Sequence, residues 1–563
     1  MNKKRRLILL ILFLPWLIAA KTVADLQISG VKAKVEKNIQ TRLNEIAQRR
    51  PLSSESDEEI KAHIAEAMYP YGYLKPLINF KRLGENKLTV SIHPGPRLLV
   101  TRLTVNIIGE GQDNPEINTV VHNLLIKEGK PFNSIKYDDS KQALMNAAEH
   151  EGYLHASFSK AEILIDKDSY TSSVTLIFET GPQYYFGQVR FDPTYISPEL
   201  LHRFVPFKYG QPYSTEQVLA FNNALASSGY FKSVTVQPQL DGAKVIPMDV
   251  HLQRASRINY TLGVGYGTDT GPRGRAGLHI SPVNRYGHKF NAMAIGSMTQ
   301  NALQGQYIIP GQKPLIDQYE IIGNLGTLNY DSGYSKSALL SLAQRHNLPN
   351  FQRLLSLNGL YERFHYNLQP NAEKTTVFPK ATFTWLNKSE QLFTPTGYKV
   401  SVNGLFANRA ALSEISFAQA SVDAKAALTL PSLRTRLYFH SIQGYTQIND
   451  VDKLPLSLAL LLGGSDNLKA YSYNAIGPGK ILTFASAEIQ KETRDKWYLL
   501  GFFDSGDVYN PTPKNLKHDI GVGLMWVSPI GPIKIGVAQA IDNNFHRSQG
   551  KQPKLVISMG PDI

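Results

Sequence analysis

Residues 258–563 contain the feature that most constrains the fold, a series of short segments in which apolar residues alternate with small or polar ones. In the first segment, RINYTLGVGYG, the alternating residues are Ile258, Tyr260, Leu262, Val264 and Tyr266. A period of two is that of a β-strand with two different faces. Turn residues divide the region at about 19 residues per strand and turn, which predicts an antiparallel β-barrel of sixteen strands.

The last segment, KLVISMGPDI, keeps this alternation through Leu555, Ile557, Met559 and Ile563. An open sheet edge in lipid would leave backbone N–H and C=O groups without partners, so the last strand of a membrane barrel is expected to pair with the first. We therefore predict a transmembrane barrel over residues 257–563. A soluble β-sandwich or propeller is the alternative.

The N-terminal sequence MNKKRRLILLILFLPWLIAA predicts export. Basic residues 3–6 precede an apolar run over residues 7–18 and two alanines, the pattern of a signal peptide over residues 1–20. The run is short for a membrane-spanning helix, although a retained anchor is the alternative. The chain has 0 cysteines, which excludes thiol chemistry and fits an oxidising compartment.

Between these two parts, a Gly-Tyr pair recurs three times at spacings of 80 and 77 residues, as Gly72-Tyr73, Gly152-Tyr153 and Gly229-Tyr230. Each pair follows a helical pattern and precedes two strand-like runs, and the glycine is expected to end its helix. A regular period of this size indicates tandem small domains. We predict three β-α-α-β-β repeats over residues 21–98, 99–182 and 183–254.

No pattern indicates an enzyme, a metal site or a cofactor. His150, Glu151 and His155 come near a zinc-protease motif, but their spacing does not place both histidines on one helix face. Asp504 and Asp507 are too few ligands for calcium. The net charge is +14, yet residues 3–6 form the only dense basic run, so no nucleic-acid partner is expected.

A long glycine-bounded loop, GGSDNLKAYSYNAIGP at residues 463–478, interrupts the strand pattern. Gly463, Gly464 and Gly477 permit sharp bends. Lys469 is its one cation, and it would seek a carboxylate if the loop entered a polar lumen. An ordinary surface loop with a solvated lysine is the alternative.

Repeats and barrel together resemble the outer-membrane assembly superfamily of BamA and FhaC, whose repeats are POTRA domains, and most of all its TamA group. Residues 463–478 resemble the sixth extracellular loop of that family, which folds back into the barrel. FFDSGDVYN at 502–510 resembles its aromatic-Asp-x-Gly strand motif. Residues 521–538 resemble the penultimate strands, and LFTPTGYKVSV at 392–402 resembles a TamA strand entry.

The loop departs from the family pattern, which has an Arg-Gly-aromatic core where this chain has Lys469-Ala470-Tyr471. The resemblance implies that Lys469 pairs with Asp504, beside Gly506 on the barrel wall. Lysine offers a point charge instead of a planar fork, and alanine disfavours left-handed backbone geometry, so a looser attachment of the loop is predicted.

The resemblance implies a factor that inserts or secretes β-barrel and autotransporter-type proteins at the outer membrane without nucleotide. The working part is expected at the seam between the first and last strands. Glycines weaken the first strand and Pro561 removes one ladder donor, so the seam could open sideways and pair with a client strand. The alternative is that the glycines only relieve crowding. Predicted gate residues are Ile258, Tyr260, Gly263, Gly265, Gly267, Leu555, Ile557, Met559 and Gly560.

The resemblance also implies a TamB-like inner-membrane partner bound by the first POTRA domain, a monomeric barrel in outer-membrane lipid, and POTRA domains in the periplasm. Two rival functions remain. A two-partner secretion transporter similar to FhaC would export a protein through the lumen, but it normally has two POTRA domains and a plug helix. A passive porin would have no use for periplasmic repeats.

Overall fold

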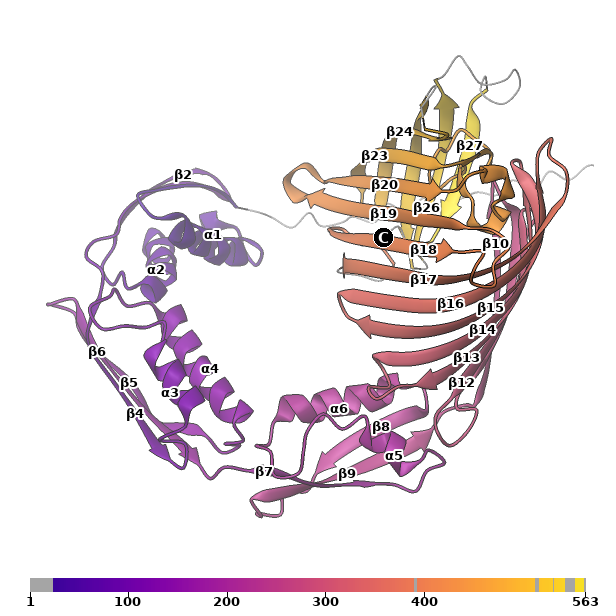
Figure 1. The fold of residues 1–563 in the computed structure, drawn as a ribbon. Helices are drawn as coiled ribbons and strands as arrows, with labels where there is room; N and C mark the ends of the chain where they lie inside the picture. Colours follow the sequence, from indigo (N-terminus) through magenta and orange to yellow (C-terminus); the bar gives the residue numbers. More distant parts are fainter. Residues whose placement is uncertain (1–23, 389–391, 512–515, 530, 542–551, 561–563) are drawn as a thin grey trace, which may run out of the picture. The chain divides into compact units, whose positions relative to one another are not determined.

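The computed structural model describes residues 24–388, 392–511, 516–529, 531–541 and 552–560 (Figure 1). The predicted signal peptide, Pro561 and Ile563 lie outside these ranges. Contacts divide the chain into two compact units. One contains Met1–Val189, Phe207–Val218 and Pro238–Met248, and the other contains Arg190–Pro206, Leu219–Gln237 and Asp249–Ile563. None of the helices in the described ranges has the length and apolar character that a membrane crossing requires.

The first repeat is a three-stranded sheet covered by two helices. Its elements are β1 (Asp25–Ser29), α1 (Ala33–Ala47), α2 (Asp57–Met68), β2 (Leu77–Gly84) and β3 (Lys87–His93), with short 3-10 turns at Leu52–Ser54 and Tyr69–Tyr71. The sheet order is β1-β3-β2. Helix α2 begins at a reciprocal capping box, in which Ser56 accepts from the Glu59 N–H and Glu59 accepts from the Ser56 N–H. Its apolar face, Ile60, Ile64 and Met68, is fully buried.

The second and third repeats have the same element order. The second contains β4 (Leu99–Gly109), α3 (Pro115–His122), α4 (Ser134–His150), β5 (Ser157–Asp166) and β6 (Thr171–Gly181), in the sheet order β4-β6-β5. The third contains β7 (Tyr185–Phe191), α5 (Pro198–His202), α6 (Thr215–Ser227), β8 (Phe231–Pro238) and β9 (Val245–Arg254), in the order β7-β9-β8. The predicted β-α-α-β-β unit is therefore confirmed three times.

The glycine of each Gly-Tyr pair lies where the preceding helical segment ends, as predicted. Gly72, Gly152 and Gly229 have φ values of +83°, +85° and +76°, a left-handed conformation that favours glycine. The tyrosines Tyr73, Tyr153 and Tyr230 that follow are buried.

Sixteen strands form one antiparallel sheet in chain order, which confirms the predicted barrel fold. They are β10 (Ile258–Gly267), β11 (Gly271–Ile280), β12 (Lys289–Gly296), β13 (Gln300–Pro310), β14 (Asp317–Tyr330), β15 (Gly333–Leu348), β16 (Phe351–Tyr366), β17 (Ala372–Lys388), β18 (Gly397–Ala407), β19 (Phe417–Leu430), β20 (Thr435–Gln447), β23 (Ile481–Arg494), β24 (Trp497–Tyr509), β25 (Lys517–Ser528), β26 (Gly531–Ala540) and β27 (Lys554–Met559).

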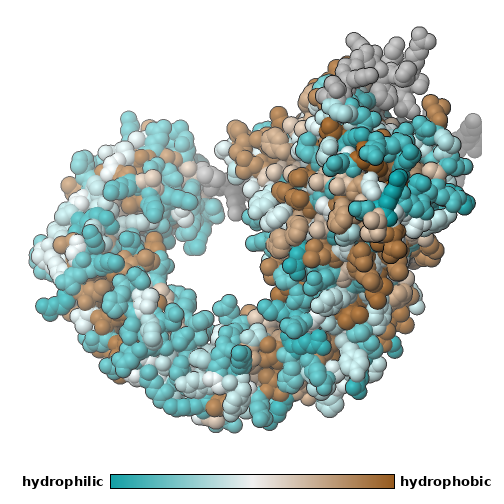
Figure 2. Space-filling view, viewed as in Figure 1, coloured by the Kyte–Doolittle hydropathy of each residue, from teal (hydrophilic) through white to brown (hydrophobic). Residues whose placement is uncertain are grey.

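The outer face of the barrel is apolar, as the alternation predicted. On the face shown in Figure 2, brown residues gather over the barrel strands, whereas the repeats are mainly teal. Leu262 and Val264 of β10 are 88% and 93% exposed, which places the apolar side of this strand outside. Several charged residues are buried instead, among them Glu488, Asp504 and Asp519. The barrel thus turns an apolar face outwards and keeps ion-pairing groups inside.

A small second sheet lies in the long connection between β20 and β23. It consists of β21 (Leu460–Leu462) and β22 (Ile476–Gly479), which pair antiparallel, with further short 3-10 turns at Val451–Lys453 and Leu456–Leu458. A 3-10 turn at Pro431–Leu433 joins β19 to β20. The β21–β22 pair closes the base of the predicted loop.

Candidate functional site at the barrel seam and lumen loop

The barrel seam lies between β10 and β27. Strand β10 pairs with β11 along its whole length, and β27 pairs with β26 from Lys554 to Met559. No backbone ladder joins β10 to β27 in the described ranges. One hydrogen bond crosses here: the Ile557 N–H donates to the Thr268 hydroxyl oxygen over 3.2 Å. The expectation of closure by first-to-last strand pairing is therefore not met in this part of the chain.

Two glycines of β10 lie opposite arginine side chains. Gly263 lies opposite Arg275 and Gly265 opposite Arg273 on β11. A Cβ at Gly265 would lie 3.0 Å from Arg273 Nε, a tight contact that the arginine side chain would have to relieve by a small shift. Gly267 ends the strand, and a Cβ there would lie 2.7 Å from the hydroxyl oxygen of Thr270. Relief of crowding is thus one role of Gly265 and Gly267, whereas a Cβ at Gly263 would meet only an ordinary contact at 3.9 Å.

The other predicted gate residues flank the seam. Ile258 and Tyr260 are exposed on the outer face of β10. On β27, Leu555 and Met559 are exposed, and Ile557 makes the bond to Thr268. The described strand ends at Met559, and Gly560 follows it with a φ of +140°.

The lumen loop, residues 463–478, is shaped by its glycines. Gly463, Gly464 and Gly477 have φ values of +115°, +114° and +116°. A Cβ at Gly463 would lie 2.1 Å from the Ser472 carbonyl oxygen, so no larger residue fits. Ala470 is not among the residues with positive φ, so the alanine costs no backbone strain where the family pattern has glycine.

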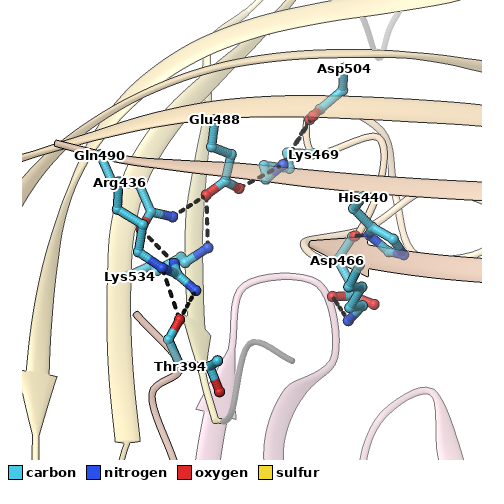
Figure 3. A network of polar contacts seen from close by, with 10 residues as sticks. Thr394, Arg436, His440, Asp466, Lys469, Glu488, Gln490, Asp504 and Lys534 are labelled. Atoms are coloured by element: carbon cyan, nitrogen blue, oxygen red, sulfur yellow. Dashed lines mark hydrogen bonds and ion pairs between the residues drawn. The ribbon is translucent and has the colours of Figure 1, made fainter. Parts of the chain in front are cut away.

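Lys469 lies among carboxylates on the inner wall (Figure 3). Its Nζ is 2.9 Å from Asp504 Oδ2 and 3.4 Å from Glu488 Oε1. Nζ also lies 4.5 Å from the ring centroid of Phe502. Burial strengthens each of these interactions and also makes the loss of any one costly. Two carboxylates and an aromatic ring therefore compensate for the geometry that an arginine fork would provide.

Further polar side chains extend this network, and sequence reasoning missed them. Lys534 Nζ and Gln490 Nε2 donate to Glu488 over 2.8 and 2.9 Å. Arg436 continues the chain to Gln490 over 2.7 Å (Figure 3). The alternation of apolar and polar residues could have shown that Glu488 and Lys534 face the lumen. It could not have shown that these two side chains form an ion pair with each other.

The wall glycine Gly506 gives the loop close access to β24. A Cβ there would lie 2.7 Å from the Thr483 carbonyl oxygen and 3.2 Å from Leu462 at the base of the loop. Loop residues Leu468, Ala470 and Tyr471 pack in one apolar cluster with wall residues Phe484, Phe502, Ala538 and Val556. Since Val556 belongs to β27, this cluster includes a residue of the last strand.

The lumen loop also bonds to both flanks of the seam. Asp269, in the turn between β10 and β11, accepts from the Ser465 N–H and hydroxyl, both over 2.9 Å. On the other flank, Lys554 of β27 donates to the Tyr471 carbonyl oxygen over 2.8 Å. The loop is therefore a bridge across two strands that lack a ladder. Asp269 and Lys554 were not predicted.

A cavity of about 270 Å³ lies beside this bridge. Asp269 and Arg273 line it from the β10 side, Ser558 and Gly560 from the β27 side, and Lys469 from the loop. Opening of the seam would therefore connect the cavity with the space beyond the two strands.

The Gly-Tyr pairs lie at the joints between successive domains. The Gly72 carbonyl accepts from the Leu98 N–H, and the Gly152 carbonyl accepts from the Tyr184 N–H, each over 2.8 Å. In the third pair, the Tyr230 hydroxyl donates to the carbonyl oxygen of Gly287, in the turn before β12, over 2.6 Å. The first two pairs thus receive the segment that begins the next domain, and the third bonds to a later turn, between β11 and β12.

The chain matches three known domain families. Residues 315–562 match the Omp85 superfamily domain, residues 25–94 match POTRA domain TamA domain 1, and residues 184–253 match a POTRA domain described as a surface antigen variable number repeat.

Solved structures with a similar fold include BamA from Haemophilus ducreyi lacking POTRA domains 1–3. Its TM-score is 0.66 at 15% identity, over 82% of this chain and 99% of that chain. CdiB from Acinetobacter baumannii has a TM-score of 0.49 at 12% identity, over 94% and 100% of the two chains. CdiB from Escherichia coli has 0.47 at 10% identity, over 95% and 99%.

The BamA likeness supports the fold, and the domain matches identify its parts. With three POTRA-like domains ahead of a sixteen-stranded barrel, the chain belongs to the Omp85 superfamily, as an outer-membrane protein insertion or secretion transporter whose POTRA domains lie in the periplasm.

Proposed function

We propose that the protein is a TamA-like assembly factor that inserts or secretes β-barrel and autotransporter-type clients through a lateral gate between β10 and β27. The observation that carries this proposal is the lack of a β10–β27 ladder in the described ranges, where the Ile557 N–H donates to the side-chain hydroxyl of Thr268. Unpaired strand edges are templates for another strand. A client strand pairing with β10 or β27 would satisfy these edges.

In this proposal, the lumen loop holds the gate closed. It holds Asp269 on one flank and Lys554 on the other, while Lys469 anchors it to the wall. Displacing the loop would break a few hydrogen bonds and leave the β10–β11 and β26–β27 ladders intact. Client folding and burial of its apolar face in lipid supply the free energy, so no nucleotide and no chemical reaction are part of the proposal.

A TamB-like partner on the first POTRA domain is the second part of the proposal. The match of residues 25–94 to the first TamA domain supports it. Export of a protein through the lumen is the rival function, and a passive pore is a further one. Both leave the seam closed while they work, which makes the seam the place to test.

The test is a disulfide across the seam. The contact between Thr268 and Ile557 identifies these two positions for a pair of cysteines. Since the native chain has 0 cysteines, the background is clean. Oxidised T268C/I557C protein is expected to stop client assembly, and a reductant should restore it.

The matched control is a cysteine pair at Leu262 and Ala276, which lie opposite each other within the β10–β11 hairpin. A disulfide at this control pair should leave client assembly unchanged because it does not bridge the seam. If the seam disulfide forms fully and clients still reach their folded, protease-resistant state, the lateral gate is wrong and luminal export gains support.

A further inference from the structure

A basic groove lies between the first and second POTRA domains, which belong to the same compact unit. Its volume is about 640 Å³. Residues of α1 and the Tyr71–Tyr73 segment line it on one side, and residues 123–136 of the second domain line it on the other. It has no part in the barrel seam.

The charges in the groove are all of one sign. Six cations line it and no carboxylate does: Lys32, Lys34, Arg97, Lys127, Lys130 and Lys136. Arg97 is held in place, because its guanidinium donates to the Tyr71 carbonyl over 3.0 Å and lies 5.4 Å from the Tyr73 ring centroid. The five lysines are exposed, and no salt bridge of the described part of the chain includes them. Their positive charge is therefore available to a ligand.

Two helix N-termini add to this positive potential. Helix α1 begins after Lys32, which provides no side-chain cap for the free N–H groups of its first turn. Helix α4 begins after Asn133, and Lys136 lies in its first turn. The first turn of a helix carries a partial positive charge that favours anions. Both ends contribute lining residues to the groove.

Apolar surface accompanies the charge. Leu125 lies in the groove and is 52% exposed, between the buried side chains of Leu124 and Ile126. Tyr71 lines the opposite side and is half-buried. A small inorganic anion would use none of this surface. An extended peptide with acidic and apolar side chains would use the charge and the apolar surface together.

From this combination we infer that the groove binds an acidic, extended segment of another periplasmic protein. At least two carboxylates of the segment pair with lysines from the two domains, and an apolar side chain packs on Leu125. Because POTRA domains lie in the aqueous periplasm, a protein segment fits the groove better than a lipid headgroup. Binding would also tie the two domains together, since each supplies cations.

Fluorescence anisotropy tests this inference on the full-length protein in detergent micelles. The probe is a labelled twelve-residue peptide of alternating Glu and Leu, and its matched control carries Gln in place of every Glu. Only the acidic peptide is expected to bind, with an affinity that falls as NaCl rises. The variant K127E/K130E should weaken binding at least about tenfold. The control K61E/K81E reverses two exposed lysines of the first domain outside the groove and should bind like the wild type.

Equal binding of the acidic and neutral peptides, or equal loss in both double variants, would overturn the inference. Binding to vesicles with anionic phospholipid but not to the acidic peptide would replace the protein ligand with a lipid. Heat-modified migration of the barrel and circular dichroism show that each variant is folded. The seam disulfide experiment is independent of these results, so each proposal can fail alone.

Discussion

Asp504 on β24 and Asp519 on β25 are direct cross-strand neighbours, and they bind consecutive residues of the lumen loop. Asp504 accepts from the Lys469 ammonium, and Asp519 accepts from the Ala470 N–H over 3.0 Å. Two buried carboxylates at this spacing repel each other unless a nearby cation or a shared proton compensates. The Lys469 ammonium therefore offsets the repulsion between these two carboxylates, and the carboxylates in turn hold the loop on the barrel wall.

Replacing Lys469 with methionine should release the lumen loop. The change keeps the length of the side chain and leaves Asp504 and Glu488 buried without their shared cation, a loss of about 3 kcal/mol or more in seating the loop. The measurement is the rate at which a protease cuts the loop in folded, membrane-embedded protein. K469R should restore most of the protection, because the positive charge returns.

Lys425 is the control for an ion pair whose carboxylate lies in water, with a lysine side chain that is itself 18% exposed. It pairs with Asp466 over 3.4 Å, and the Asp466 side chain is 74% exposed. Surface pairs contribute about 1 kcal/mol or less, so K425M should barely change the cutting rate. If K469M and K425M are cut equally fast, the buried ion pair does not hold the loop.

Replacing Asp269 with alanine should loosen the seam. The change removes both bonds to Ser465 and detaches the loop from the β10 flank while the anchor at Lys469 remains. Spin labels at Leu262 and Leu555, both exposed on the outer face, report the distance across the seam. Double electron–electron resonance is expected to show a broader, longer distance distribution for D269A.

Asp317 provides a matched control for this measurement. It contacts His346 across β14 and β15, away from the seam in the strand order. The variant D317A should leave the distance distribution unchanged. An unchanged distribution in D269A as well would show that the loop does not restrain the seam.

The fold could be predicted because its signals are local. A period of two marks strands such as β10, and a capping box at Ser56 and Glu59 marks the start of α2. The Gly-Tyr pairs mark domain ends because only glycine readily takes the left-handed conformation there. Each of these signals can be read within about twenty residues of sequence.

The site was harder to predict because its contacts join distant parts of the chain. Ser465 and Asp269 are 196 positions apart, and Ile557 and Thr268 are 289 apart. Alternation shows which face a residue occupies, but the register across the seam depends on the whole barrel. The resemblance supplied the pairing of Lys469 with Asp504, and it had no counterpart for Lys554 or Asp269.

The joint between the second and third POTRA domains should respond to acid. Lys244 donates to Glu110 over 2.6 Å, and the Gln183 N–H donates to the same carboxylate over 3.0 Å. These two bonds hold the pKa of Glu110 below its ordinary value. A carboxyl group whose pKa is lowered by folding stabilises the joint at neutral pH, where it is ionised. This stabilisation is lost as the pH falls through the folded-state pKa.

We therefore expect the Gln183 amide resonance to titrate with a midpoint below the ordinary glutamate value of about 4.3. The variant K244M should raise this midpoint, and E110Q should abolish the titration. A midpoint at or above the ordinary value in the wild type would show that the pair does not form in solution.

Gly152 should tolerate substitution far less than Gly129, although both lie in the second domain with positive φ, at +85° and +75°. A Cβ at Gly152 would lie 2.5 Å from the Tyr184 carbonyl oxygen, whereas a Cβ at Gly129 would meet nothing within 4 Å. Both alanine variants pay backbone strain of about 1 kcal/mol, and only G152A adds a clash with the segment that begins the third domain. Hydrogen exchange of the Tyr184 amide, which bonds to Gly152, measures the difference. Exchange should be accelerated in G152A and nearly unchanged in G129A. Equal exchange in both variants would mean that the Gly-Tyr position is a helix end only and not a joint between domains.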